Sequence, residues 1–204
     1  LKVPDHGTVS FEDSVKGKVS FELKEIDDFV ILKSDQMPTY HLAHILDDHA
    51  MGITHVIRGD EWISSTPRHL LIHNALGIEP PEYVHVPLIL GKDRSKLSKR
   101  HGATSALEYR GQGYLADAIF NFLALLGWSP GDDTEVMDRD EIVRRFSIER
   151  INDSPAIFDS DKLEWMNGVY IRNMDADQLM GEILPFMERP ESAGGLPDAV
   201  SRPV

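Results

Sequence analysis

The hydrophobic pattern changes along the chain from weak alternation to helical spacing. Hydrophobic and polar residues alternate weakly over residues 1–28, as in Val9-Ser10-Phe11. This alternation predicts short antiparallel strands joined by a turn at Lys16-Gly17. The apolar run from Phe29 to Leu32, followed by Lys33, predicts a buried strand.

Residues 40–90 switch between helical and extended patterns. The predicted elements are a helix over 40–51 ended by Gly52, a strand over 53–58, a helix over 66–76 with Ser65 or Thr66 as N-cap and Gly77 after it, and a strand over 84–90. Together with the strand over 29–33 this rhythm is typical of a parallel α/β sheet, which binds ligands beyond the carboxyl ends of its strands. Those ends carry the most polar residues: Lys33-Ser34, Arg58-Gly59-Asp60-Glu61 and the segment from Gly91 onward.

From about residue 102 the spacing is helical. Helices are predicted over 105–110, 115–126, 139–146, 160–167 and 176–187. Trp165 and Met166 are predicted to be core or interhelix contacts. Residues 190–204 contain three prolines and Gly194-Gly195, a composition that favours a linker or a chain end over a packed element.

Composition narrows the class of protein. A chain of 204 residues can form one large or two small domains with a real core. The absence of cysteine excludes a disulfide scaffold, a thiolate zinc site and a cysteine nucleophile. The longest apolar stretch, 118–128, is too short to span a bilayer, and no export signal opens the chain. We therefore expect a cytoplasmic protein without a membrane partner.

The charge is uneven along the chain. The formal net charge is −13, which argues against nucleic-acid binding by bulk electrostatics. Residues 1–101 hold 12 Lys and Arg against 15 Asp and Glu, whereas the remainder holds 9 against 19. All nine histidines also lie in the first part. Any site for a polyanion should therefore be local and in the first half.

One basic loop meets that requirement. Residues 92–101 contain five Lys and Arg and one Asp, directly after a predicted strand and Gly91. Cationic groups at the mouth of an α/β sheet suit a triphosphate or a departing pyrophosphate, because they neutralise charge that develops during phosphoryl transfer. The alternative is a solvated surface run or a localisation-like basic patch.

Within this loop, Lys96-Leu97-Ser98-Lys99-Arg100 is similar to the KMSKS-type signature of class I aminoacyl-tRNA synthetases, and with His101-Gly102-Ala103 it resembles the bacterial glutamyl-tRNA synthetase family. Four further stretches stand in that family's order and spacing: 33–43 with 47–49, 56–62, 157–159 and 163–168. The resemblance covers roughly residues 1–175.

The resemblance implies an α/β fold: the second half of a class I synthetase Rossmann-type parallel sheet, followed by an α-helical stem-contact region and the start of a helical bundle. The implied parts are a connective-domain tail over 1–28, the second half of the catalytic nucleotide-binding domain over 29–101, a helical stem-contact domain over 102–172, and the start of an anticodon-binding region or a linker over 173–204.

The implied reaction is the ATP-dependent ligation of L-glutamate to tRNA(Glu) through glutamyl-adenylate, with Mg²⁺ accompanying ATP. Whether tRNA(Gln) is a second acceptor is left open by the sequence. The resemblance also implies a monomer and no protein-bound metal.

By the same resemblance, Lys96 and Lys99 are the implied catalytic residues. The implied ATP contacts are Glu61, Ile89, Leu90, Lys96, Ser98, Lys99 and Arg100, the implied glutamate contacts are Tyr40, His44 and Arg58, and Trp62 would wall the site. Arg58 suits an acidic substrate, because a guanidinium binds a carboxylate through paired hydrogen bonds.

Simpler interpretations stand beside these. Tyr40 could be a half-buried packing group, Arg58 could pair with Asp60 or Asp48, and Trp62 could belong partly to the core. His41, His44, Asp47, Asp48 and His49 share one predicted helix, but nothing else supports a metal site. Gly111-Gln112-Gly113 resembles a dinucleotide motif but follows a helical segment, so we interpret it as an interhelix turn. The acidic stretch 132–141 lacks the glycine of a calcium loop.

The sequence contains no His-x-Gly-His motif, which the first half of a class I synthetase sheet supplies for ATP. We therefore expect this chain to be part of a longer enzyme and not to form glutamyl-adenylate alone; pyrophosphate exchange at enzyme-like rates would contradict that expectation. Other functions remain open: a tRNA-binding or regulatory module, another nucleotidyl transferase of the same superfold, or an inactive remnant.

Overall fold

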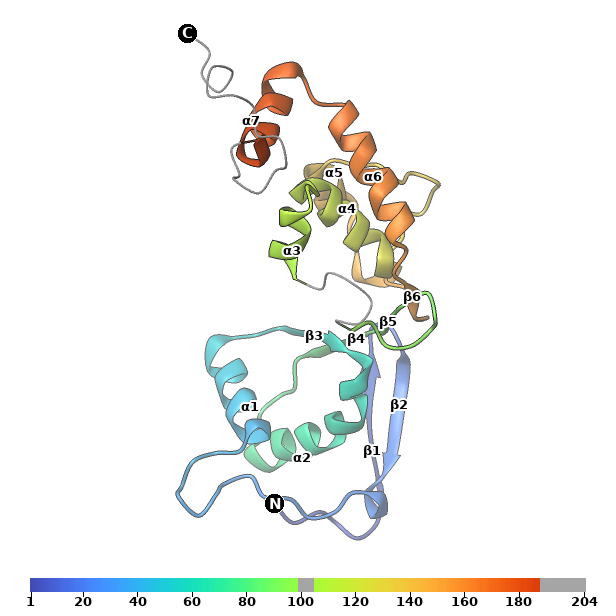
Figure 1. Ribbon diagram of the computed structural model, residues 1–204. Coiled ribbons are helices and arrows are strands. Elements are labelled where there is room, and N and C mark those ends of the chain that lie inside the picture. Colours follow the sequence, from blue (N-terminus) through green and yellow to red (C-terminus); the bar gives the residue numbers. More distant parts are fainter. Residues whose placement is uncertain (99–104, 188–204) are drawn as a thin grey trace.

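The computed structural model describes residues 1–98 and 105–187, which form two bodies joined at a small pair of strands (Figure 1). The lower body contains strands β1 (Thr8–Asp13), β2 (Gly17–Glu22), β3 (His55–Gly59) and β4 (Glu82–Val86) with helices α1 (Tyr40–Met51) and α2 (Thr66–Leu76). The upper body contains α3 (Ala106–Gly111), α4 (Ala116–Gly127), α5 (Arg139–Arg145), α6 (Ser160–Arg172) and α7 (Ala176–Met187). Strands β5 (Ile89–Leu90) and β6 (Ala156–Ile157) lie at the junction.

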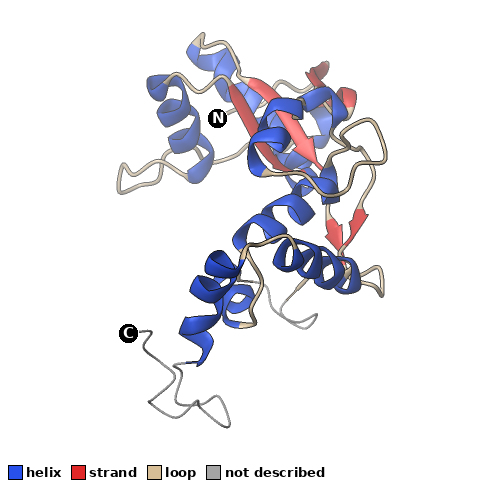
Figure 2. Cartoon of the chain, turned by 90° about the horizontal axis from the view of Figure 1, so that it is seen from above, coloured by secondary structure: helices blue, strands red, loops and turns tan. Residues whose placement is uncertain are grey.

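Short 3-10 helices complete the chain at η1 (Leu23–Glu25), η2 (Asp60–Ser65) and η4 (Ile148–Arg150). Helices occur in both bodies, and the strands of the main sheet lie in the body that contains the N-terminus (Figure 2). Within the part of the chain that the structure describes, no helix is both long and apolar enough to cross a membrane.

The N-terminal hairpin is confirmed. Strands β1 and β2 pair antiparallel, with Phe11 opposite Val19 and Asp13 opposite Gly17. Gly17 has φ +69°, a left-handed conformation that favours glycine at the end of the turn. The hairpin joins the main sheet, because Asp13 of β1 pairs with Tyr83 of β4.

The main sheet has the strand order β2-β1-β4-β3, and β3 runs parallel to β4 from His55–Glu82 to Gly59–Val86. Helix α2 connects these parallel strands, as the strand–helix–strand rhythm predicted. Ile45 of α1, Ile72 of α2 and Val84 of β4 are fully buried. Both helices end where the sequence predicted, at the left-handed glycines Gly52 and Gly77.

The predicted strand over 29–33 is wrong. This segment is a loop in which Val30 is 63% and Leu32 is 52% exposed. Phe29 exchanges hydrogen bonds with the N-terminal Leu1, and the remaining bonds are local, since Lys33 N–H donates to the carbonyl of Met37 and Thr39 N–H to that of Ile31. An apolar run becomes a strand only where a partner edge is available, and no described strand pairs with this one. Lys33 and Ser34 therefore do not lie at the carboxyl end of a strand of the sheet, where the sequence predicted them to face a ligand.

The predicted strand over 84–90 is divided. Strand β4 ends at Val86, and β5 pairs in parallel with β6 instead of with the main sheet. Pro87 lies between them and cannot donate a ladder hydrogen bond. This break turns the chain away from the main sheet immediately before the basic loop.

Helices α4 and α6 pack together in the upper body through Phe122, Leu126, Leu163 and Met166. Met166 is therefore core, one of the two predicted alternatives, whereas Trp165 is 47% exposed and is not a core residue. The helix predicted over 160–167 continues to Arg172, and that over 176–187 has the predicted bounds.

The glycine-rich segment after α3 is an interhelix turn, as interpreted from the sequence. Asn167 of α6 is buried and bridges this turn, because its Oδ1 accepts from Leu115 N–H at 2.8 Å and its Nδ2 donates to the Gly113 carbonyl at 3.2 Å. The interpretation of 190–204 as a linker lies outside the described residues.

Candidate active site

Arg58 lies near the carboxyl end of β3 and is held by three side chains. Its Nε donates to Nε2 of His85 at 3.0 Å, and its Nη2 donates to the Thr66 hydroxyl at 2.8 Å. Both Nη groups lie 3.3 Å from Nδ1 of His69. The guanidinium therefore has a fixed orientation, set by residues from α2 and β4.

None of those partners of Arg58 carries a formal negative charge. The salt bridges found among the described residues include none from Arg58 to Asp48 or Asp60, so the simple pairing considered from the sequence is absent there. Burial lowers the pKa of Arg58, yet a guanidinium stays protonated at neutral pH. Its positive charge is thus available for an anionic ligand.

Aromatic rings surround this guanidinium. The Tyr40 ring centroid lies 5.5 Å from that of Trp62 and 4.9 Å from that of His44. The Arg58 Cζ lies 5.8 Å from the Trp62 ring and 5.3 Å from the Tyr83 ring. The structure therefore brings together the four residues that the resemblance assigned to the glutamate pocket and its wall: Tyr40, His44, Arg58 and Trp62.

The degree of burial differs among these residues. Tyr40 is 56% exposed, so it is not the half-buried packing group considered as an alternative, while Trp62 is half-buried. His44 places Nδ1 3.5 Å from Asp48, and its buried Nε2 has no partner among the described residues. Burial lowers the pKa of His44, which favours the neutral ring.

The sequence did not predict the buried residues that hold Arg58 and its partners in place. His85 and His69 are fully buried, and Asp13 is nearly so. Asp13 Oδ2 lies 2.5 Å from His85 Nδ1, and His69 Nε2 lies 2.9 Å from His41 Nδ1. The available signal was a histidine inside the apolar stretch Val84-His85-Val86, where a polar side chain requires a partner.

Lys96 and Glu61 connect the basic loop to the same end of the sheet. Lys96 Nζ lies 3.1 Å from Glu61 Oε1. A hydrogen bond from its own backbone N–H, followed by that from Lys96, lowers the pKa of Glu61. A Cβ at Gly59 would collide with the Glu61 carboxylate, so glycine leaves the space that this side chain fills.

The described part of the basic loop folds back on β5. Leu97 N–H donates to the Ile89 carbonyl at 2.9 Å, and Lys96 forms an isolated antiparallel β-bridge with Leu90. This reversal of the chain brings the backbone of Ile89 and Leu90, which the resemblance implies as adenine contacts, beside Lys96. Ser98 is exposed at the end of this segment. Lys99 and Arg100, implied as catalytic and ATP-binding residues, lie outside the described residues.

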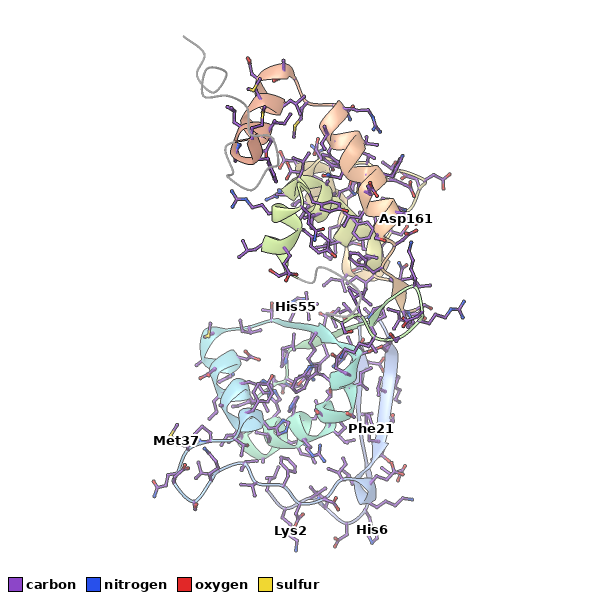
Figure 3. All side chains as sticks on the ribbon, viewed as in Figure 1. Lys2, His6, Phe21, Met37, His55 and Asp161 are labelled. Carbon is purple, nitrogen blue, oxygen red and sulfur yellow. The ribbon has the colours of Figure 1, made fainter. Side chains whose placement is uncertain are left out.

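Lys92 does not belong to this group. Its Nζ lies 2.7 Å from Asp161 and 3.5 Å from Asp159. Asp161 lies at the start of α6 (Figure 3). The sequence predicted one phosphate site over the whole run 92–100, whereas in the structure Lys92 pairs with Asp161 and Asp159. Lys92 connects the loop to the helical body, whereas Lys96 lies on the side of the Arg58 pocket.

The histidines of α1 make ring and hydrogen-bond contacts of their own. His41 contacts His69, and the His44 ring centroid lies 4.5 Å from that of His69. Among the described residues, no group of three or more His, Asp or Glu side chains is arranged to hold a metal ion.

The parallel pair β3–β4, the basic loop after β5 and the aromatic-walled arginine are the features that the sequence associated with a class I synthetase α/β fold. Residues 1–165 match the family described as tRNA synthetases class I (E and Q), catalytic domain, and the chain belongs to that family.

Individual relatives agree with the family. The chain is 55% identical over 187 residues to a glutamate–tRNA ligase of Heliobacterium modesticaldum and 52% identical over 191 residues to one of Dehalococcoides mccartyi, covering 92% and 94% of this chain. A crystal structure of a glutamate tRNA ligase from Elizabethkingia meningosepticum in complex with its amino acid has a TM-score of 0.82 at 37% identity and covers 91% of this chain. The chain spans 38%, 40% and 40% of these three relatives' lengths.

Proposed function

We propose that this chain supplies the glutamate pocket and phosphate loop of an enzyme that ligates L-glutamate to tRNA(Glu) with ATP. The observation that carries the proposal is the orientation of Arg58, whose hydrogen-bond partners are all uncharged. A half-buried cation without an acidic partner gains most from a ligand carboxylate.

Arg58 would bind the side-chain carboxylate of glutamate. One N–H of its Nη1 group has no partner among the described residues and can donate to a carboxylate oxygen. The Tyr40 and Trp62 rings would cover the methylene groups of the substrate. Glutamine would lose the charge-assisted part of this interaction, which favours glutamate as the substrate.

The chemical step needs no covalent enzyme intermediate. An oxygen of the glutamate α-carboxylate attacks the α-phosphorus of ATP, and the bond from that phosphorus to the bridging oxygen breaks, so pyrophosphate leaves with the electron pair. Lys96, with Lys99, would neutralise the charge on the departing phosphates, and Mg²⁺ would enter with ATP as part of the substrate. A terminal ribose hydroxyl of the tRNA then attacks the glutamyl carbonyl carbon and loses its proton, and the bond from that carbon to the phosphate oxygen breaks, so AMP leaves.

The backbone of Ile89 and Leu90 would meet adenine, and Glu61, Ser98 and Arg100 would contact ATP. Residues 1–28 would be the tail of a connective domain, 29–101 the second half of the catalytic domain, 102–172 a stem-contact domain and 173–204 the start of an anticodon-binding region or linker. We propose a monomer in the cytoplasm. A binding module or another nucleotidyl transferase would not need the uncompensated Arg58 inside aromatic walls.

A hybrid enzyme tests this function. The chain replaces the matching segment of the Heliobacterium relative, and ATP–pyrophosphate exchange is measured with glutamate, glutamine and aspartate. The proposal expects exchange driven by glutamate alone. A folded hybrid that shows no exchange, or equal exchange with glutamine, would contradict it.

A further inference from the structure

Arg58 determines which nitrogen of His85 carries the proton. Arginine can only donate hydrogen bonds, so Nε2 of His85, 3.0 Å from Arg58 Nε, must present a lone pair. The ring proton is then on Nδ1, where it donates to Asp13 Oδ2 at 2.5 Å. Both ring nitrogens of this buried histidine are therefore satisfied in one tautomer only.

Hydrogen bonds from neighbouring groups keep Asp13 in its carboxylate form, which only accepts hydrogen bonds. Its Oδ1 accepts from the backbone N–H groups of Val15 at 3.0 Å and Lys16 at 2.9 Å, in the hairpin turn. Its Oδ2 also accepts from the backbone N–H of His85 at 3.1 Å. Burial raises the pKa of Asp13, but these hydrogen bonds outweigh it and the net pKa is lowered. A carboxylate is thus the stable form at neutral pH.

On the other side of Arg58, hydrogen bonds fix the tautomer of a second histidine, His69. His69 accepts from the guanidinium at Nδ1, so its proton lies on Nε2 and donates to Nδ1 of His41 at 2.9 Å. Thr66 completes the set of neutral acceptors. Among the described residues, the carboxylate that these hydrogen bonds connect to the guanidinium is that of Asp13, one imidazole away.

We propose that Asp13 and His85 are positioning residues for Arg58: the carboxylate of the hairpin fixes the His85 tautomer, and that tautomer fixes the guanidinium that selects a carboxylate substrate. This inference rests on the proposed function for its substrate, but the tautomer itself does not. It assigns a substrate-orienting task to Asp13, a residue 72 positions away from His85 in the sequence.

Asp13→Asn is the informative variant. If the amide nitrogen replaces Oδ2, it faces the two N–H donors of His85, so the ring must move its proton to Nε2 and oppose the Arg58 Nε–H. If the amide is turned over, its nitrogen faces the backbone donors of Val15 and Lys16. The turned-over amide would keep the ring tautomer but oppose backbone N–H groups that cannot move their protons, so we expect the first arrangement, which breaks the Asp13–His85–Arg58 hydrogen-bond relay while conserving side-chain size. Glu12→Gln is the matched control, because Glu12 is exposed on the same strand and its change removes the same charge.

Two readouts separate the inference from the proposed function. Imidazole ¹⁵N shifts of the chain itself report the tautomer, and KM values of the hybrid enzyme report substrate recognition. The expected results are a protonated Nδ1 at His85 in the wild type and in Glu12→Gln, and a protonated Nε2 in Asp13→Asn. The KM for glutamate should rise roughly tenfold or more in Asp13→Asn, with the KM for ATP changed less than about twofold.

A wild-type His85 protonated on Nε2, or a folded Asp13→Asn variant with unchanged glutamate KM, would overturn the relay. If Asp13→Asn does not fold, His85→Gln replaces it, since its amide can donate to Asp13 and accept from Arg58 without a tautomer. His85→Gln should keep glutamate KM within about threefold, whereas His85→Leu should raise it roughly tenfold or more; equal values would overturn the relay. A wild-type hybrid without exchange would count against the proposed function, while the ring-nitrogen measurement would still decide the tautomer.

Discussion

Lys96 Nζ lies 3.1 Å from Glu61 Oε1, so the basic loop contacts the residue that follows strand β3 by two positions. Arg58 lies on that same strand. The ion pair therefore brings the proposed phosphate loop and the proposed carboxylate pocket to one edge of the sheet, as the transfer of a carboxylate to an α-phosphate requires.

The two lysines of the loop should behave differently on substitution. Lys96→Ala should raise the KM for ATP of the hybrid enzyme roughly tenfold, because it removes a cation from the phosphates. Lys92→Ala should leave that KM within about twofold, since Lys92 is paired with α6. Steady-state exchange kinetics check this pair, and an equal loss from both lysines would show that Lys92 also reaches ATP.

Gly59→Ala should act through Glu61. The backbone at Gly59, with φ −66° and ψ 149°, accepts alanine, but the new Cβ would displace the Glu61 carboxylate. We expect the loss of ATP affinity in Gly59→Ala to resemble that of Glu61→Ala, and the double variant to lose no more than either single one. Additive losses in the ATP titration would argue that Gly59 has a separate task.

Stability should fall in mild acid. Burial, followed by the nearby His44 and Arg58, lowers the pKa of His69 to about 2, and burial lowers that of His85. Below the ordinary histidine pKa of 6.5 the unfolded chain binds protons that the folded chain does not, so stability is present above that pH and decreases as the pH falls.

Urea denaturation of the chain at pH 7.5 and pH 5.5 measures this effect. The midpoint should be lower at pH 5.5, and His69→Gln should reduce the difference between the two midpoints. Identical midpoints at both pH values would mean that these histidines are protonated without cost in the folded state.

Asn167→Ala should destabilise the helical body by about 1–3 kcal/mol, because the substitution leaves the buried Leu115 N–H without its acceptor. Glu164→Ala, at an exposed position of the same helix, serves as the control and should change stability by less than about 0.5 kcal/mol. Chemical denaturation compares the two variants. A similar loss for both would indicate that water replaces the Asn167 bridge.

Local signals explain where sequence-based prediction succeeded. Helix α1 has the predicted bounds because apolar spacing and a left-handed glycine are both properties of neighbouring residues. The same holds for α7 and for the hairpin. The residues that the resemblance assigned to the glutamate pocket also come together, around Arg58.

Long-range contacts explain where prediction failed. The run 29–33 has strand composition but no described partner strand, and Pro87 redirects β5 to a strand that lies far along the sequence. Asp13 and His85 were missed because their pairing joins a hairpin turn to a parallel strand. Lys92 belonged to the basic run by charge, yet its partners are on α6.

We propose that Arg58 selects glutamate by its charge, and the Arg58→Met variant of the hybrid enzyme tests this selection. We measure kcat/KM for pyrophosphate exchange with glutamate and with glutamine. We expect the glutamate value to fall at least roughly 100-fold while the glutamine value changes little, so that the preference is lost. A folded Arg58→Met enzyme that still prefers glutamate over glutamine would show that another residue selects the substrate.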